Sequence, residues 1–318
     1  MPRRKSPRKT ATPVTFAILT LFLLGVIGVI ENGSAQSRSA PVEVPFEFVH
    51  NQIVVTVKIG GKGPYHMLVD TGSDPSAIDL ATAKELGLGL DSRSYAATGA
   101  GSDTQTGQMT RLPSIELGTI VARDLVAGAI DLKKLSERLE RPIQGVLGYT
   151  FLRDRIIQID YAVSKLRFFL ESPYAGIQNQ PNTVNKIAMP FRYDGGVLID
   201  SVFINGQKLK ATLDTGSSGT FALTPEAAAI LGLDDQPQEG AAEKSVGYKG
   251  QDEGRSGVVK SVRIGRLSLE SAPVSFWPTG AGHDKAKFQL DVGNGFFKDY
   301  LMTFDFRGKI VVFEEPDD

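Results

Sequence analysis

Two copies of one tetrapeptide decide the fold of this chain: Asp70-Thr71-Gly72-Ser73 and, 144 residues later, Asp214-Thr215-Gly216-Ser217. Each copy follows an apolar segment, His66–Val69 or Lys210–Leu213, so that each aspartate ends a predicted strand. A single Asp-Thr-Gly sequence is weak evidence, because an Asx-type turn uses the same residues. Two copies in the same context indicate a shared function.

The tetrapeptides belong to a longer internal repeat. Predicted strands precede them at Gln52–Ile59 and Val197–Ile204, and predicted hairpins close the two copies at Arg155–Leu170 and Tyr300–Glu314. A repeat with an offset of 144 or 145 residues is a duplicated domain and not a short solenoid unit. We therefore predict a first lobe over 41–171, a linker over 172–185 and a second lobe over 186–318.

The composition of the 318 residues excludes several classes of protein and site. With 41% hydrophobic and 22% charged residues, the chain has an ordinary globular balance. The absence of cysteine excludes disulfides, zinc–thiolate and iron–sulfur sites and thiol nucleophiles, and three histidines leave little for a histidine-rich metal site or a Ser-His-Asp triad. Because 34 glycines favour tight turns, we expect an all-β fold with short helices. We expect neither a metal nor a cofactor.

The first 35 residues have the layout of a secretory leader. Five basic residues and one acidic residue flank the apolar run Val14–Ile30, and small residues at Gly33 and Ala35 suit cleavage after Ala35. The run of 17 residues is also close to the roughly 20 of a spanning helix, so an uncleaved anchor is the alternative. We expect an exported protein, either periplasmic or anchored in the inner membrane and facing the periplasm. The remainder is mildly acidic, which argues against nucleic acid as a partner.

The paired aspartates suit one kind of chemistry. Two carboxylates that a pseudo-two-fold axis brings together cannot both ionise easily, so they share a proton and titrate in two separate steps. One of them can then deprotonate a bound water while the other donates a proton to a carbonyl oxygen. The two aspartates therefore indicate a hydrolytic enzyme, and an amide bond is the natural target of this chemistry.

The sequence resembles the retropepsin-like and pepsin-like aspartic proteases over about residues 42–316, and most of all exported bacterial proteins with two retropepsin-like domains. The resemblance implies an acid-protease fold in which two homologous β-barrel lobes are related by a pseudo-two-fold axis. It also implies that Asp70 and Asp214 are the catalytic residues. By the same resemblance Thr71 and Thr215 join the two loops, Gly72 and Gly216 complete the motif, and the hydroxyls of Ser73 and Ser217 bond the outer carboxylate oxygens.

The family also has a flexible hairpin, the flap, that folds over the cleft between the lobes. In the first lobe the glycine-rich segment with Gly99, Ala100 and Gly101 matches this feature, and in the second lobe the segment with Gly247 and Tyr248 does. An ordinary surface hairpin is the alternative for each. We predict that both segments contact substrate.

A second mark of the family is a pair of hydrophobic residues and a glycine in a late strand beneath the aspartate loop. The first lobe matches it with Val146-Leu147-Gly148, whereas the second lobe reads Asp291-Val292-Gly293. If Asp291 is buried, it needs a partner or a proton. Either the register is shifted by one residue or the second lobe is less regular.

Three hypotheses follow for the function. The first is an exported aspartic endopeptidase that acts on polypeptides and has one active site per chain. It is expected to be a monomer rather than a dimer, and to contact a membrane only through its N-terminal segment if that segment is not cleaved. The second has each lobe pair only with its counterpart in another chain. The third is a non-catalytic peptide-binding protein of the cell envelope that keeps the cleft.

Overall fold

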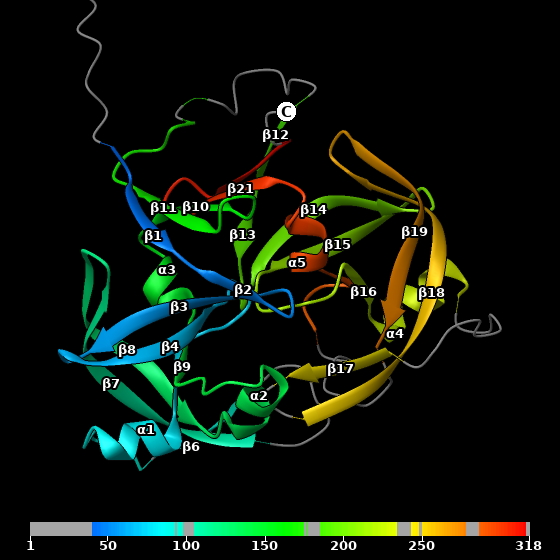
Figure 1. Cartoon of the computed structure of the whole chain (residues 1–318). Coiled ribbons are helices and arrows are strands. Elements are labelled where there is room, and N and C mark those ends of the chain that lie inside the picture. Colours follow the sequence, from blue (N-terminus) through cyan, green and yellow to red (C-terminus); the bar gives the residue numbers. More distant parts are fainter. Residues whose placement is uncertain are drawn as a thin grey trace, which may run out of the picture. The chain divides into compact units, whose positions relative to one another are not determined.

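The computed structural model describes residues 40–92, 94–97, 105–174, 176, 185–233, 243–247, 250–277 and 286–315. The strands form one six-stranded sheet and two eight-stranded sheets, and the few helices are short (Figure 1). The predicted leader lies outside the described residues. Within the described residues no helix is long and apolar enough to cross a membrane.

The two eight-stranded sheets are copies of each other. The first, in the order in which the strands pair, contains β2 (Glu47–Val49), β3 (Gln52–Ile59), β4 (Lys62–Val69), β9 (Gly145–Leu147), β5 (Ser76–Asp79), β8 (Ile120–Ile130), β7 (Gln105–Leu117) and β6 (Ser94–Ala97). The second contains β13 (Arg192–Tyr193), β14 (Val197–Ile204), β15 (Gln207–Asp214), β20 (Leu290–Gly293), β16 (Phe221–Leu223), β19 (Leu267–Phe276), β18 (Gly250–Ile264) and β17 (Glu243–Gly247). In each sheet a further pairing, β3–β7 or β14–β18, closes six strands into a barrel. The predicted duplication and barrel lobes are confirmed.

The third sheet joins the lobes. It contains β1 (Val42–Pro45), β11 (Lys165–Phe169), β10 (Ile156–Asp160), β21 (Leu301–Asp305), β22 (Ile310–Glu314) and β12 (Lys186–Pro190). The central pair is antiparallel, with Gln158 of β10 opposite Thr303 of β21. Because each lobe contributes three strands in mirrored order, the pseudo-two-fold axis passes between β10 and β21 (Figure 1).

The helices follow from local sequence signals. They are α1 (Leu80–Glu85), α2 (Lys133–Arg138), α3 (Tyr149–Leu152), α4 (Pro225–Leu231) and α5 (Asn294–Phe297). In α4 the Thr224 side chain accepts from the Ala227 N–H, Pro225 occupies the first turn, and Gly232 ends the helix in the left-handed region at φ 63°. α3 and α5 directly follow β9 and β20, so each occupies the same place in its lobe.

One apolar core extends through both lobes and the shared sheet. Ile157 and Ile159 of β10, Phe304 of β21 and Phe313 of β22 are at most 1% exposed and belong to it. Burial of this many large side chains drives the two lobes together, since each removes apolar surface from water. The two aspartate loops are thereby held in a fixed relation within one chain.

Candidate active site

Asp70 and Asp214 lie at the ends of equivalent strands. The Asp70 N–H donates to the Leu147 carbonyl of β9 at 3.1 Å, and Asp214 pairs with Gly293 of β20. Each carboxylate then accepts a hydrogen bond from its own loop: the Gly72 N–H donates to Asp70 Oδ1 at 2.8 Å, and the Gly216 N–H to Asp214 Oδ1 at 2.7 Å. The same backbone geometry fixes both carboxyl groups.

Each of the two carboxyl groups lies against the glycine of the opposite loop, next to the pseudo-two-fold axis. A Cβ placed on Gly72 would lie 2.5 Å from Asp214 Oδ2, and one on Gly216 would lie 2.3 Å from the Asp70 Cγ. Only glycine leaves room for the carboxyl group of the opposite lobe at these positions. The side chains of Asp70 and Asp214 are within hydrogen-bonding reach of each other.

Thr71 and Thr215 join the loops by four hydrogen bonds. The Thr71 hydroxyl donates to the Leu213 carbonyl at 2.7 Å, and the Thr215 hydroxyl donates to the Val69 carbonyl at 2.8 Å. Each hydroxyl also accepts from the N–H of the other threonine at 3.0 Å. Because both residues are buried, these bonds fix the relative position of the two aspartates.

Burial and mutual repulsion make the carboxyl pair hold a proton. Burial, followed by the charge of Asp214, raises the pKa of Asp70 well above its usual range. Burial also raises the pKa of Asp214, but a hydrogen bond with Asp70 and backbone N–H groups of Gly216, Gly72 and Ser217 oppose that rise. The two carboxyl groups therefore share one proton.

The two serines of the motif act differently from each other. The Ser73 hydroxyl donates to the Pro75 carbonyl at 2.9 Å, and the backbone N–H of Ser73, rather than its hydroxyl, supports Asp70. The Ser217 N–H likewise supports Asp214, whereas its hydroxyl interacts with the side chain of Asp291. The hydroxyls of the two serines thus bond other groups, and each serine supports its aspartate through its backbone N–H.

Both predicted flap segments belong to hairpins. β6 pairs with β7, and β17 pairs with β18 so that Gly247 is opposite Gly250. Gly99, Ala100, Gly101 and Tyr248 lie outside the described residues, so their contact with substrate stays a prediction. β17 of the second lobe contacts α2 of the first, which places this hairpin beside the other lobe (Figure 1).

Residues of both lobes that the sequence did not single out hold the second aspartate loop. The Gln52 amide donates to the Gly216 carbonyl at 2.8 Å, and the Asn51 amide donates to the Ser218 carbonyl at 3.0 Å. The Asn294 amide donates to the carbonyls of Thr215 at 2.6 Å and Asn51 at 2.8 Å. The signal available in the sequence was a polar glutamine, Gln52, at the start of the apolar run Gln52–Ile59.

An aromatic pair lies beside the first aspartate loop. The rings of Tyr149 and Tyr193 are stacked with centroids 3.5 Å apart and an angle of 7° between their planes. The Tyr193 hydroxyl is buried without a hydrogen-bond partner in the described structure. Burial, then the charges of Asp74 and Asp70, raises its pKa far above the usual value, so the hydroxyl stays neutral.

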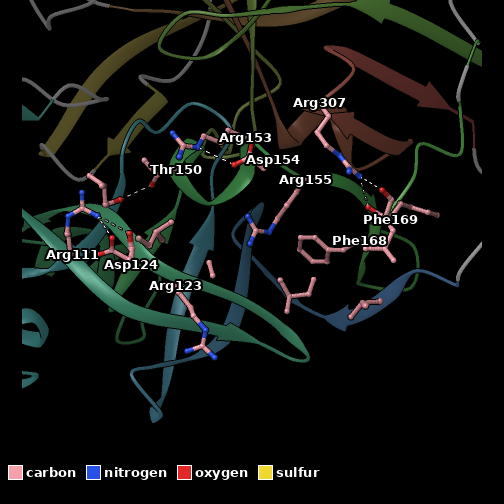
Figure 2. A pocket seen from close by; sticks show the side chains of 16 residues that line it. Arg111, Arg123, Asp124, Thr150, Arg153, Asp154, Arg155, Phe168, Phe169 and Arg307 are labelled. Atoms are coloured by element: carbon pink, nitrogen blue, oxygen red, sulfur yellow. Dashed lines mark hydrogen bonds and ion pairs between the residues drawn. The ribbon is translucent and has the colours of Figure 1, made fainter.

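A cavity of about 680 Å³, lined by first-lobe residues and by Arg307 of the second lobe, contains neither aspartate. Figure 2 shows the arginines that line it, among them Arg111 paired with Asp124 at 2.6 Å and Arg153 paired with Asp154 at 3.4 Å. Its carboxylates are exposed and paired with arginines, so the cavity lacks the acid–base pair found at the lobe junction. No group of three or more candidate metal ligands occurs among the described residues.

A family model described as "Aspartyl protease" matches residues 55–151 and 201–290, which is more than half of the chain and takes in both aspartate motifs. The crystal structure of a retropepsin-like aspartic protease from Rickettsia conorii is similar, with 20% sequence identity and a TM-score of 0.33 over 41% of this chain and 90% of that one. Curated protein sequences give no match.

Proposed function

Because the chain belongs to the aspartyl protease family, we propose that it is an aspartic endopeptidase in which Asp70 and Asp214 of one chain form a single active site. The observation that carries this proposal is the contact between the two carboxyl groups, each of which excludes any side chain larger than glycine on the opposite loop. Such a pair supplies an acid and a base at one point in space.

The first step uses the single proton of the pair, which the proposed mechanism places on Asp70. A water between the carboxyl groups loses a proton to the ionised Asp214, and its oxygen forms a bond to the scissile carbonyl carbon. At the same time the neutral Asp70 gives its proton to the carbonyl oxygen. The product is a neutral gem-diol, and the proton has moved from Asp70 to Asp214.

The second step returns the proton. Asp214 donates to the amide nitrogen while Asp70 takes a proton from one gem-diol hydroxyl, and the carbon–nitrogen bond breaks. A carboxylic acid and an amine leave, and the pair is again as it began. Activity is therefore expected to fall at low pH, where Asp214 is protonated, and at high pH, where Asp70 loses its proton.

The test is cleavage of an unfolded protein at acidic pH by three purified variants. Asp70→Asn and Asp214→Asn keep the side-chain shape but remove the acid–base pair, so each is expected to lose activity by at least about a thousandfold. Asp200→Asn is the matched control, because Asp200 is an exposed aspartate on β14 of the second lobe. Activity retained in either dyad variant contradicts the proposal.

A peptide-binding protein without catalysis is the second candidate, because a third carboxyl group, that of the buried Asp291, lies near Asp214. A peptide in which a hydroxyl group mimics the tetrahedral intermediate distinguishes the two functions. Binding of this peptide together with turnover of the unfolded protein supports the endopeptidase. Binding without any turnover supports the second candidate.

We also propose that the protein is exported, on the strength of its basic and apolar N-terminal segment. N-terminal sequencing of the protein recovered from a cell fraction outside the cytoplasm tests this. A mature chain that begins at Gln36 supports a cleaved signal, and a chain that keeps the segment and stays with the membrane supports an anchor. Recovery of the full chain from the cytoplasm contradicts export.

A further inference from the structure

Asp291 is a buried carboxyl group in the strand that passes beneath the second aspartate loop. It lies on β20, its residue is 4% exposed, and its Oδ1 has no hydrogen-bond partner among the described residues. β20 pairs with β15 and β16, which places Asp291 opposite Thr212 and Ala222. A buried and unpaired carboxylate is costly, so the group requires an explanation.

The first lobe shows that the fold does not need a carboxyl here. Val146 occupies the equivalent position on β9, opposite Leu68 and Ala77, and these three residues belong to one apolar cluster. Since the pairing of β20 with β15 has the same register as that of β9 with β4, Asp291 replaces Val146 without any shift along the strand. The alternative of a register displaced by one residue is therefore wrong.

The neighbours of Asp291 belong to the second aspartate loop. The Ser217 hydroxyl interacts with the Asp291 carboxyl group, and the charge of Asp214 acts against its ionisation. The backbone at Ser217 is also bound to the chain that follows β20, because the Asn294 N–H donates to the Ser217 carbonyl at 2.9 Å. Asp291 thus touches the loop that positions Asp214.

Among the residues that the structure describes, no cationic side chain neutralises the carboxylate of Asp291. On the three elements packed against β20, the titratable groups are Lys208, Lys210 and Asp214 of β15, while β16 and α5 have none. Of these only Asp214 acts on the Asp291 carboxyl group. Burial, followed by the charge of Asp214, raises the pKa of Asp291 well above its usual range, although the hydrogen bond from the Ser217 hydroxyl opposes that rise. An ionised Asp214 therefore favours a proton on Asp291.

We propose that Asp291 is a positioning residue for the aspartate pair and that it must carry a proton for the site to work. As a neutral acid it supports the Ser217 hydroxyl and leaves Asp214 as the ionised member. Once ionised, it would place a second negative charge next to Asp214. The protonated Asp214 would then be a weaker acid and would transfer its proton less readily to the amide nitrogen in the second step. This inference rests on the proposed endopeptidase activity.

The first experiment compares pH profiles of kcat/KM for the wild type, Asp291→Asn and Asp291→Val. If two protons, on Asp70 and Asp291, are both required, wild-type activity falls about a hundredfold per pH unit on the alkaline side. Asp291→Asn stays neutral, so its activity falls only about tenfold per pH unit. Asp291→Val, which installs the first-lobe residue, is expected to lower kcat about tenfold or more with little change in KM, because Ser217 loses its polar partner.

The second experiment needs no turnover. The ¹³C resonance of the Asp291 carboxyl carbon, assigned by its loss in Asp291→Asn, is followed against pH beside that of the exposed Asp200. Asp291 is expected to keep the shift of a neutral acid long after Asp200 has ionised. Circular dichroism establishes that both Asp291 variants are folded.

The outcomes separate the two proposals. Equal alkaline slopes for the wild type and Asp291→Asn, or joint ionisation of Asp291 and Asp200, overturn the role of Asp291 even if the protein is an active peptidase. A wild type that cleaves nothing while Asp291 stays neutral overturns the endopeptidase instead. In that case the role of Asp291 is decided by the affinity of the wild type and of Asp291→Asn for the hydroxyl-bearing peptide, measured against pH. If the affinity of the wild type falls more steeply at alkaline pH than that of Asp291→Asn, the role is supported. If the two affinities fall equally, the role is overturned.

Discussion

Thr71 and Thr215 bind each other's loop reciprocally: each N–H donates to the other's hydroxyl at 3.0 Å, and each hydroxyl donates to the strand that leads to the opposite aspartate. The bonds run between residues 142 to 146 positions apart in the sequence, so they exist only when both lobes are folded and docked. The position of the aspartate pair is therefore coupled to the stability of the whole molecule.

Thr215→Val tests this coupling. The substitution keeps the shape of the side chain but leaves the Val69 carbonyl and the Thr71 N–H without their partner, at a cost of about 1–3 kcal/mol for each unpaired buried group. Urea unfolding is expected to show this loss of stability together with a loss of peptidase activity. Thr56→Val, at an exposed position of β3, is the matched control. Equal unfolding midpoints for the two variants would refute the coupling.

Gly72→Ala tests the close approach of the carboxyl groups. The added Cβ would lie 2.5 Å from Asp214 Oδ2, so the carboxyl group of Asp214 must move away from Asp70. A displacement of about 1 Å at a reacting group can cost on the order of a hundredfold in rate, and we expect a loss of kcat of at least this size. The control is Gly89→Ala, since nothing lies within 4 Å of a Cβ at that position. Thermal unfolding checks that Gly72→Ala is folded, and a folded variant with wild-type kcat would disprove the contact.

The stability of the protein is expected to depend on the protonation of Asp291. Because its pKa is raised in the folded state, its contribution to stability is complete below the usual value of 3.8 and is lost as the pH rises through the folded-state pKa. Each pH unit between the two pKa values corresponds to about 1.4 kcal/mol. Urea unfolding should thus find Asp291→Asn more stable than the wild type at neutral pH, with the difference shrinking as the pH falls toward 3.8. A difference independent of pH would show that Asp291 does not titrate abnormally.

Much of the fold was predictable from the sequence because turn and capping residues in each copy of the repeat mark where strands and helices begin and end. β3 and β14 begin and end where the apolar runs Gln52–Ile59 and Val197–Ile204 do. The cap of α4 follows from Thr224 and Pro225, whose preferences are local. Two strands that each end in an aspartate within a duplicated domain imply a meeting of carboxyl groups on the symmetry axis.

The parts that could not be predicted depend on contacts between distant segments. The Asn294 amide binds the backbone carbonyl of Asn51, 243 residues away. Because every residue has a backbone carbonyl, the sequence does not show which one accepts this bond. The sequence flagged Asp291 as irregular, but its register and burial appear only when β20 is paired with β15. The hydroxyl of Ser73 bonds the Pro75 carbonyl, an outcome that depends on the local path of the loop and not on residue type.

The central claim is that the aspartates of one chain form one active site, and mixing two inactive variants tests it most directly. Asp70→Asn and Asp214→Asn chains are purified separately, combined in equal amounts after unfolding and refolding together, and assayed on an unfolded protein at acidic pH beside the wild type. If Asp70 and Asp214 act within one chain, the wild type cleaves and the mixture stays as inactive as either variant. Recovery of activity in the mixture, with an intact pair formed between two chains, would contradict the account.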